Sequence, residues 1–425
     1  MRSLGDTLGL YRFDVTYRRR TIPFFVLFAL CFFCLPAQAQ YGGGSGTEND
    51  PYLICTAEQM NAVGASPGDW DKHFHLRADI DLSEYTGTSY NIIGKEAMND
   101  SFTGVFDGND HTISNLSLNL SREKYTGLFG YVTGEVLNLG LINPEVFSQG
   151  SYVGALAGYL IDGTISNCYV EGANVSGDDY VGGLVGSCAG RLEISYSTGS
   201  VMGDRYVGGL VGLVSDSTVI MCYSRADVSG HMEVGGLTGK ISHEQGVVSN
   251  CYATGNVQGG TYAGGLVGHV QNGRAYKSYS TGRVSGDQNV GGFTGMIRVL
   301  GGVTHCFWDT ERSGNSTSPG GTGKTTEEMQ TITTFTPDAG WDFINTWTIC
   351  DGMNYPVLLW QIPAADLLCP DGVNFIDFAL FAQHWLDKPC GTANYYCQGT
   401  DLDHSGSVDL HDLEIFADNW LKGIP

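Results

Sequence analysis

The chain has 425 residues, including 61 glycines, and its formal net charge at pH 7 is −23. Such an excess of negative charge repels phosphate backbones and anionic membrane surfaces, so nucleic-acid binding is disfavoured. The length allows two or three ordinary domains or one long repeat architecture. The carboxylates suit calcium binding, salt tolerance or simple solubility, and solubility is the commonest reason for them.

The first 39 residues have the features of a secretory signal peptide. Three arginines at 18–20 precede an apolar run over 22–35, and a small-residue cleavage site, Ala-Gln-Ala, follows at 37–39. The run is too short to span a bilayer comfortably, and no other stretch approaches ~20 apolar residues. We therefore expect no membrane span, and a protein that is secreted or held at the cell surface after cleavage near Ala39.

Residues 40–100 are predicted to be an N-terminal lead-in and cap region. Thr56 stands directly before the segment 57–60, which predicts a short helix capped by that threonine. The stretch that starts at Phe102 reads as a strand, an Asp-Gly-Asn turn and a second strand. We interpret it as the first coil of a repeat structure that occupies residues 101–310.

The repeat is a Tyr-Val-Gly-Gly-Leu-Val-Gly pattern that returns at intervals of 26 to 29 residues. Its copies begin at Tyr125, Tyr152, Tyr180, Tyr206, Val234, Tyr262 and Val290. A fixed period of this size is typical of stacked repeats, in which each unit buries its apolar face against its neighbours. Short β-prone runs broken by turn residues predict two or three strands per repeat. We expect a mainly β fold, a β-helix or β-solenoid of about seven to eight coils.

Aligned columns across the repeats indicate which positions face the interior. One apolar column comprises Leu128, Leu156, Leu184, Leu210, Leu237, Leu266 and Phe293, and another comprises Val153, Val181, Val207, Val234, Ala263 and Val290. The two columns are three residues apart, and such residues on a straight strand face opposite sides. Either this strand is buried on both faces, or the intervening Gly pair bends the chain so that both columns face inward.

A third column alternates cysteine with serine, at Cys168, Ser195, Cys222, Cys251, Ser278 and Cys306. Serine is neither a redox partner nor a thiolate ligand, so the alternation predicts small buried side chains and free thiols. A Cys222–Cys251 disulfide between adjacent rungs is the alternative, although parallel Cβ vectors make its geometry awkward.

The turn before each Gly-Gly motif supplies the residues of a candidate active site, in the column Asp178, Asp204, His231, Gly260 and Asp287. A glycan-cleaving β-helix needs clustered carboxylates, or calcium with Arg or Lys, on one exposed face. Stacked Asp178 and Asp204 suit a cation, but Gly260 interrupts the column, no basic partner recurs, and Ser-Gly-Asp is ordinary turn composition. The sequence leaves enzymatic activity undecided and favours a non-enzymatic chain.

Residues 311–362 are predicted to cap the C-terminal end of the solenoid. Their first part is rich in Thr, Ser and Gly, and the segment 340–360 is aromatic. A repeat stack needs such a cap, because an exposed edge strand would pair with other chains.

The strongest indication of a binding site is the loop 401–412. Asp401, Asp403, Ser405, Asp409 and Asp412 put oxygen-bearing side chains at loop positions 1, 3, 5, 9 and 12, Gly406 permits the turn at position 6, and Ser407 offers its backbone carbonyl at position 7. This is the ligand pattern of an EF-hand calcium loop, which an amphipathic helix then follows. The loop departs from it in the weaker ligand Ser405 and in Asp412, where a bidentate Glu is usual. An acidic surface turn is the alternative.

An incomplete copy of this loop lies 35 residues upstream, where Asp366, Asp371, Asn374 and Asp377 flank Val373. Leu368 and Pro370 occupy the ligand positions 3 and 5. We therefore expect this copy to bind calcium poorly or not at all unless the backbone compensates. The helical sequences FALFAQHWL and LEIFADNWL follow the two loops at the same offset, and a Cys390–Cys397 disulfide is expected between them.

Two loop-and-helix units at this spacing resemble a dockerin, the module that attaches secreted proteins to cohesin partners. The resemblance covers about residues 365–423. It implies a small all-α calcium module over 363–425 and a cohesin-like or other extracellular protein partner. Dockerins of the best-known kind carry Ser-Thr at loop positions 10 and 11, where this chain has Phe375-Ile376 and Leu410-His411.

The Gly-Gly-Leu-Val-Gly repeats resemble the GLUG motif family of secreted bacterial proteins, over about residues 100–310. That resemblance implies an extracellular or surface β-solenoid and supplies no catalytic residues. The sequence thus favours an exported, non-enzymatic adhesion or binding scaffold with a calcium-dependent docking module. The alternative is a polysaccharide-active β-helix enzyme, a glycoside hydrolase or lyase, that the dockerin recruits to a complex. A glycan is a candidate ligand in both cases.

Overall fold

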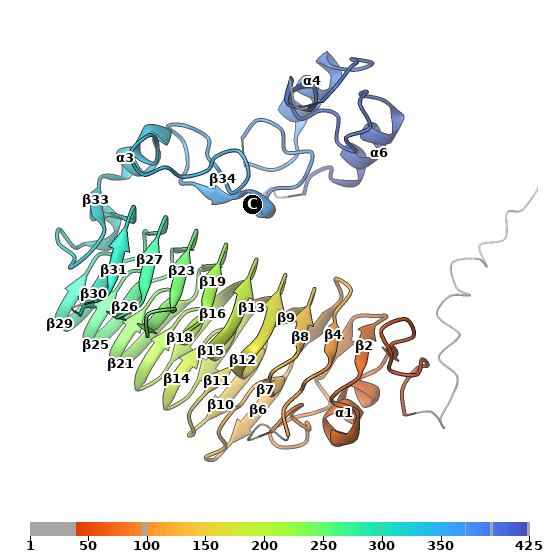
Figure 1. The fold of residues 1–425 in the computed structure, drawn as a ribbon, viewed down its shortest axis with the longest axis vertical. Coiled ribbons are helices and arrows are strands. Elements are labelled where there is room, and N and C mark those ends of the chain that lie inside the picture. Colours follow the sequence, from red (N-terminus) through yellow and green to blue (C-terminus); the bar gives the residue numbers. More distant parts are fainter. Residues whose placement is uncertain (1–39, 96–99, 299, 370, 392–393, 423–425) are drawn as a thin grey trace, which may run out of the picture. The chain divides into compact units, whose positions relative to one another are not determined.

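The computed structural model describes residues 40–95, 100–298, 300–369, 371–391 and 394–422. The predicted signal peptide, 1–39, lies outside this part of the chain. Figure 1 shows strands stacked one behind the other from β2 to β31. These strands pair in parallel and form a β-solenoid of about eight turns, as the repeat predicted.

The first of the two sheets is built from strands of successive turns. Its main path is β1 (Tyr52–Ile54), β2 (His73–Leu76), β4 (Val105–Asp107), β8 (Glu135–Leu137), β12 (Ala157–Ser166), β15 (Val185–Glu193), β18 (Val211–Ser215), β22 (Thr238–Ser242), β26 (Val267–Gln271) and β30 (Thr294–Ile297). Beside it pair β7 (Phe129–Val132), β19 (Thr218–Ile220), β23 (Val247–Ser249), β27 (Arg274–Tyr276) and β31 (Gly302–Thr304). Parallel pairing thus extends upstream of residue 101, into the predicted lead-in region.

The remaining strands of the solenoid form the second sheet. In chain order they are β3 (Ile80–Asp81), β5 (Thr112–Ser114), β6 (Ser117–Leu120), β9 (Gly140–Ile142), β10 (Glu145–Ser148), β11 (Val153–Gly154), β13 (Tyr169–Ser176), β14 (Asp179–Gly182), β16 (Tyr196–Met202), β17 (Arg205–Gly208), β20 (Tyr223–Ser224), β21 (Asp227–Gly235), β24 (Tyr252–Ala253), β25 (Val257–Gly264), β28 (Tyr279–Ser280), β29 (Val284–Gly291), β32 (Phe307–Asp309) and β33 (Thr322–Lys324). The segment from Phe102 therefore contributes to both sheets, because β4 belongs to the first and β5 to the second.

The Gly pair bends the chain between the two sheets, so the second of the two sequence interpretations is correct. β14 ends at Gly182 and β15 begins at Val185, and both Val181 and Leu184 are fully buried. A Cβ atom on Gly183 would lie 2.3 Å from the carbonyl oxygen of Gly209 on the next rung. Glycine is required here because neighbouring rungs approach closely, and not because the backbone is left-handed.

Left-handed backbone falls instead on a column of larger residues. Tyr125, Tyr152, Tyr180, Tyr206, Glu233, Tyr262 and Asn289 have φ between 55° and 67°. The rings of the first four tyrosines, Tyr125 to Tyr206, stack between rungs, and the centroids of Tyr180 and Tyr206 are 4.6 Å apart. An aromatic pair contributes about 0.5–1.5 kcal/mol. That gain offsets part of a left-handed cost of roughly 1–2 kcal/mol per residue.

The cysteine and serine column lies in the core, as predicted. Cys168, Ser195, Cys222, Cys251, Ser278 and Cys306 are all buried, and the four cysteines are free thiols. Burial raises the pKa of the Cys168 thiol to about 12, so the thiol stays protonated and unreactive. The alternative disulfide between Cys222 and Cys251 does not form.

The two ends of the solenoid are covered by different structural elements. At the N-terminal end lies helix α1 (Ala57–Ala65), capped by Thr56 as predicted. At the other end, the Ser318 hydroxyl oxygen accepts hydrogen bonds from the backbone N–H groups of Phe293 and Thr294. Helices α2 (Thr310–Ser313) and α3 (Thr326–Met329) flank β33.

Residues 341–361 cover the side of the last turns. There the rings of Tyr169, Tyr196, Tyr223, Tyr252 and Tyr279 form a second stack, with centroids 4.7–5.1 Å apart. The hairpin of β34 (Trp347–Thr348) and β35 (Val357–Leu358) packs against this stack. The indole of Trp360 donates a hydrogen bond to the Met221 carbonyl at 3.0 Å. This aromatic cluster anchors the cap to the solenoid.

The C-terminal helical pair, residues 363–422, has a small core of its own. Its main helices are α4 (Phe375–Gln383) and α6 (Leu410–Asp418), with the short α5 (Tyr395–Gln398) between them. The predicted Cys390–Cys397 disulfide is present, and a second bridge, Cys350–Cys369, ties the pair to the cap. Within the described ranges, no helix is long and apolar enough to cross a membrane.

Candidate metal centre

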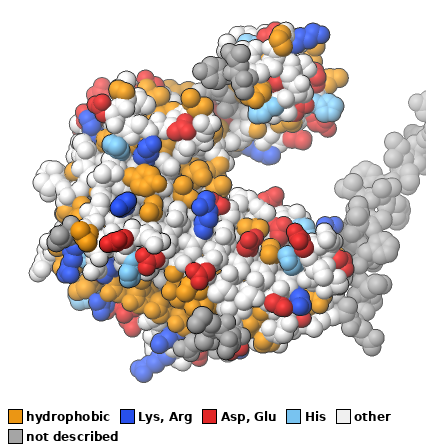
Figure 2. Space-filling model, viewed as in Figure 1, with side chains coloured by type: hydrophobic (Ala, Val, Ile, Leu, Met, Phe, Trp, Pro, Cys, Tyr) orange, Lys and Arg blue, Asp and Glu red, His pale blue; other side chains and the backbone are white. Residues whose placement is uncertain are grey.

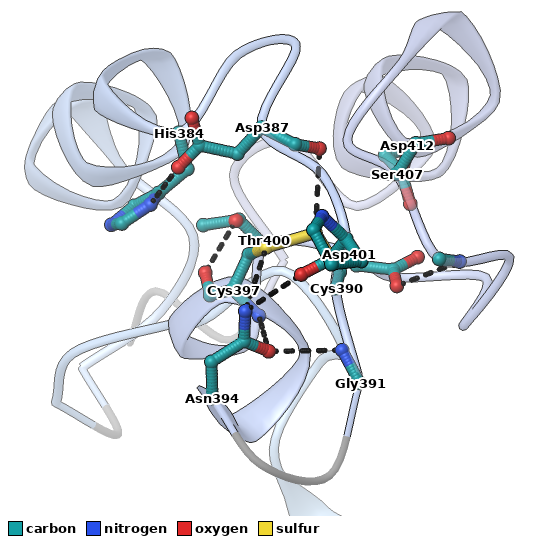
Figure 3. Close-up of a disulfide and its surroundings, with 12 residues drawn as sticks. His384, Asp387, Cys390, Gly391, Asn394, Cys397, Thr400, Asp401, Ser407 and Asp412 are labelled. Atoms are coloured by element: carbon teal, nitrogen blue, oxygen red, sulfur yellow. Dashed lines mark hydrogen bonds and ion pairs between the residues drawn. A yellow bond between two sulfur atoms is a disulfide. The ribbon is translucent and has the colours of Figure 1, made fainter.

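The second loop, residues 401–412, gathers three carboxylates around one point. One oxygen each from Asp401, Asp403 and Asp412 lies within 4.8 Å of the others. Asp401 and Asp412 are fully buried, whereas Asp403 is exposed. Figure 3 shows Asp401, Ser407 and Asp412 near the Cys390–Cys397 disulfide, and Cys390 donates its N–H to the Gly406 carbonyl at 2.9 Å.

Backbone N–H groups hold two of these carboxylates in place. Asp401 accepts from the N–H groups of Ser405 and Gly406, both at 3.0 Å. Asp412 accepts from Leu402 and Asp403 through Oδ1, and from Asp409 through Oδ2 at 2.8 Å. Asp412 thus ties the start of the loop to its end. This bracing role is additional to the ligand role that the sequence suggested.

The remaining predicted ligands lie along the same loop. The Ser405 hydroxyl donates to the Ser407 carbonyl at 3.3 Å, so these two oxygens adjoin. The Asp409 carboxylate caps α6, accepting from the His411 N–H at 3.0 Å and from the Ser407 hydroxyl at 3.1 Å. Because of this cap the helix begins at Leu410, inside the loop, whereas the sequence predicted a helix that follows the loop.

The chemistry of this donor set fits a hard divalent cation. Among the described residues, no Lys, Arg or His forms an ion pair with Asp401, Asp403 or Asp412. Three like charges so close together repel one another unless a cation compensates them. Carboxylate, hydroxyl and carbonyl oxygens are the ligands that Ca²⁺ takes. When bound, the cation would supply this compensation and order the loop.

The first loop, residues 366–377, has the same backbone arrangement. Asp377 accepts from the N–H groups of Leu367 and Leu368 through Oδ1, and from Asn374 through Oδ2. These bonds are the counterparts, 35 residues earlier, of those that Asp412 makes. The Asn374 side chain caps α4, as Asp409 caps α6.

The acidic side chains of the first loop also converge. One of them stands at a position that supplies no ligand in the calcium-loop pattern. An oxygen of Asp371, at position 6, lies within 4.8 Å of oxygens of Asp366 and Asp377. Oδ1 of Asp366 is buried and has no hydrogen-bond partner in the described part of the chain. Burial, with the nearby Asp377 and Asp371, raises the pKa of Asp366 to about 6. The exposed Leu368 occupies position 3, as predicted, and brings no oxygen.

The two units are joined by reciprocal backbone bonds. Val373, at position 8 of the first loop, donates to the Lys422 carbonyl and accepts from Leu421, just beyond α6. Val408, at position 8 of the second loop, pairs in the same way with Asp387 and Leu386, just beyond α4. Each loop is therefore supported by the other unit's helix. The sequence offset of 35 residues corresponds to a structural repeat.

The candidate catalytic column on the solenoid is assembled only in part. Asp178, Asp204 and His231 stack on adjacent rungs, and one oxygen each of Asp178, Asp179 and Asp204 lies within 4.8 Å of the others. Burial, then the charge of Asp178, raises the pKa of Asp179. His231 lies 3.3 Å from Asp204, but both are exposed to solvent. His231, Gly260 and Asp287 line one shallow hollow, which Asp178 and Asp204 do not line.

A buried charged cluster in the solenoid escaped the sequence analysis. Glu233 takes the place of a tyrosine in the left-handed column, and its Oε1 lies 2.6 Å from His269 Nδ1 and 3.3 Å from Lys240 Nζ. Burial would raise the pKa of Glu233, but the hydrogen bond from His269 and the charge of Lys240 outweigh it and lower that pKa. The break in the tyrosine column was the available signal.

Comparison with known proteins identifies the repeat. The model of the GLUG motif matches residues 149–176, 230–258 and 259–285. Halomucin of Haloquadratum walsbyi is 35% identical over 165 residues, which are 37% of this chain and 2% of halomucin. A Gly-rich membrane protein of Evansella cellulosilytica is 37% identical over 138 residues, 31% of this chain and 16% of that protein. The chain thus spans a small part of the length of these relatives, and the helical pair lies outside the GLUG matches.

The solved structures support the fold. The crystal structure of an immunoglobulin A1 protease-like protein from Bacteroides ovatus superposes with a TM-score of 0.51 and 22% identity. The match covers 76% of this chain and 96% of that one. At this identity the likeness shows the β-solenoid fold alone.

Proposed function

We propose that this chain is an extracellular, non-enzymatic binding scaffold whose C-terminal helical pair is ordered by Ca²⁺ and docks onto a protein partner. The observation that carries the proposal is the convergence of Asp401, Asp403 and Asp412, which form no ion pair with Lys, Arg or His among the described residues. Ser405, Ser407 and Asp409 complete the ligand set from the same loop.

An extracellular location has independent support. GLUG repeats and a halomucin likeness suggest a protein outside the cell or on its surface. The disulfides Cys350–Cys369 and Cys390–Cys397 suit an oxidising compartment. Millimolar calcium outside cells would occupy even a loop of modest affinity.

A docking role rests on apolar side chains that the helical pair leaves in solvent. Phe375 and Leu410, at position 10 of the two loops, are 77% and 70% exposed, and Ile376 is 62% exposed. Phe375, Phe378, Leu413, Phe416, Ala417 and Trp420 line a groove between α4 and α6. Exposed apolar residues next to an apolar groove are typical of a protein interface. An extracellular partner of the cohesin type would cover them.

Calcium titration of the full chain tests the metal site. We expect binding heat and a rise in the melting temperature of the helical pair, both abolished by Asp403→Ala, which alters an exposed ligand. Asp178→Ala is the matched control, because Asp178 belongs to the other acidic cluster. Loss of the heat in Asp178→Ala but not in Asp403→Ala would place the cation on the solenoid. Absence of heat in the wild type would refute the calcium site.

Co-purification from the native secretome, with and without a chelator, tests docking. We expect a partner that is retained with calcium, released by chelator, and lost when Phe375 and Leu410 are both changed to Ser. Ile344→Ser is the control, since Ile344 is 71% exposed but lies in the cap. Retention of the partner by the Phe375→Ser, Leu410→Ser variant would contradict the docking surface.

A further inference from the structure

A long groove crosses the outward face of the second sheet. It has a volume of about 660 Å³ and runs from β6 to the start of β29, across seven rungs. Parallel strands lie about 4.8 Å apart, so the groove is roughly 29 Å long. It lies across the strands and therefore follows the direction of stacking.

Strict register makes the floor of this groove continuous. Val146, Val175, Val201 and Val228 pair rung to rung and point into the core. Because side chains alternate along a strand, the residues on either side of each valine face outward. Two columns of outward side chains thus line the groove along its length.

Neutral hydrogen-bonding groups dominate these two columns. Most of the outward residues are Ser, Asn or Gln, and Arg283, at one end, is the single cation in the lining. Oδ1 of Asp227 accepts from both the backbone and the side-chain N–H of Asn256, at 2.8 and 3.0 Å. This bridge between two rungs fixes an amide and a carboxylate at the surface before any ligand arrives.

The chemistry of the lining excludes two classes of linear polymer. A polyanion would meet Glu145 and Asp227 in the groove and a protein with a net charge of −23. A peptide that lies along the groove cannot bind by adding a strand, because the strands between its two ends, from β10 to β25, already pair with a neighbour on both sides. An uncharged polymer rich in hydroxyl groups has neither difficulty. Amide side chains donate to and accept from hydroxyls, and carboxylate side chains accept from them.

Two exposed apolar side chains interrupt the polar lining. Phe147 is 41% exposed and Met202 is 60% exposed. Both lie in the same outward column, separated by the rung of Ser176, and are therefore about 10 Å apart. A pyranose ring offers an apolar C–H face that packs on such side chains while its hydroxyls reach the flanking polar groups. Figure 2 shows acidic and basic side chains scattered over the face in view, which has no basic tract that would attract a polyanion.

We propose that this groove binds a neutral linear glycan whose chain lies along the stacking direction, with its rings packed on Phe147 and Met202 and its hydroxyls bonded to Asn174, Asp227 and Asn256. The proposal rests on the proposed scaffold function and assigns it a ligand class. It does not involve the calcium loops, so glycan binding is expected to be equal in calcium and in chelator.

Affinity electrophoresis and calorimetry of the full chain test this site. The probes are soluble neutral glycans (a β-linked glucan, an α-linked glucan, a mannan and a xylan) with polygalacturonate as the charged comparison. At least one neutral glycan should bind, and the affinity of its oligomers should rise until they span about 29 Å. Phe147→Ala and Asn174→Ala should each weaken binding about tenfold, which is about 1.4 kcal/mol. Ile344→Ala, outside the groove, should bind as the wild type does.

The outcomes separate the two proposals. Failure of every neutral glycan to bind, binding of polygalacturonate alone, or wild-type affinity in both groove variants would each overturn the glycan site. Glycan binding that persists in a chain without a calcium response would support the groove and refute the docking module. Circular dichroism spectra that match the wild type would show that the groove variants are folded.

Discussion

The two loops of the helical pair have one backbone arrangement and different sets of oxygen atoms. In both, the aspartate at position 12 accepts three backbone N–H groups, and position 9 caps the following helix. The second loop adds oxygens at positions 3 and 5, where the first has Leu368 and Pro370. The comparison teaches that the backbone bracing of such a loop and its supply of ligand oxygens depend on different residues. The oxygens can therefore be lost while the bracing is kept.

The largest expected effect tests whether the two arrangements are equivalent. Asp377→Ala and Asp412→Ala should each destabilise the helical pair in chelator by about 3 kcal/mol or more, because each leaves three backbone N–H groups without an acceptor. Hydrogen exchange of α4 and α6 measures this loss. The corresponding Asn variants keep one acceptor oxygen and should lose less. Collapse in only one of the two Ala variants would show that the loops are braced differently.

The second effect concerns the disulfide that lies beside one loop only. Replacing Cys390 and Cys397 by Ser opens a bridge that closes a short loop, which is expected to cost about 2 kcal/mol. The bridge supports Gly406, so calcium affinity of the second loop should fall. Calorimetry of the double variant measures the change. Unchanged affinity would show that the loop does not need this support.

The third prediction concerns the calcium affinity of the first loop after a substitution that adds an oxygen. Leu368→Asp places a carboxylate at position 3, and Leu368 is 53% exposed, so no core contact is lost. With Asp366, Asp371 and Asp377 already converging, calcium affinity of this loop should rise at least about tenfold, or about 1.4 kcal/mol. A second binding event in calorimetry is the readout. Leu359→Asp, in the cap, is the control and should add no event.

The smallest expected effect concerns two residues that lie just beyond α4 and α6 and are related by the same 35-residue repeat. Leu386 and Leu421, 35 residues apart, have φ of 69° and 64° and are largely exposed. Asn adopts this left-handed conformation more readily than Leu. Leu386→Asn and Leu421→Asn should therefore each stabilise the pair by several tenths of a kcal/mol, up to about 1 kcal/mol, in urea unfolding. A gain at only one exit would weaken the case for symmetry.

Much of the solenoid was predictable because each repeat restates the same constraint. The Leu184 column, the buried Cys168 column and the bend at the Gly pair were all visible as aligned positions. The recurring tyrosines were visible in the sequence, but their stacking was not predicted. Nothing in the sequence shows that Tyr180 adopts a left-handed backbone and places its ring on Tyr206. Single departures from a column were the harder cases. The sequence shows Glu233 only as a departure from the tyrosine column, because its partners Lys240 and His269 are 7 and 36 residues away in the chain.

The helical pair was predictable to a lesser extent. Spacing alone identified Asp401, Asp403 and Asp412, which the structure brings together, and it located the disulfide between Cys390 and Cys397. An ungapped comparison of the two loops could not place Asp371, because its side chain converges from a position that does not supply a ligand in the pattern. Nor did spacing show that Asp412 braces the loop, since backbone donors carry no sequence signal.

The charged cluster at Glu233 has a consequence for how the turns assemble. Most turns present nearly identical inner surfaces, so a chain that slipped by one turn during folding would still bury leucine against leucine. A slip at this point would instead separate Glu233 from His269, which lies on the next turn, and a buried charge that loses a hydrogen-bonding partner is strongly destabilising. The trio of Glu233, Lys240 and His269 therefore gives one turn an identity, and with it a unique place in an otherwise repetitive sequence of turns.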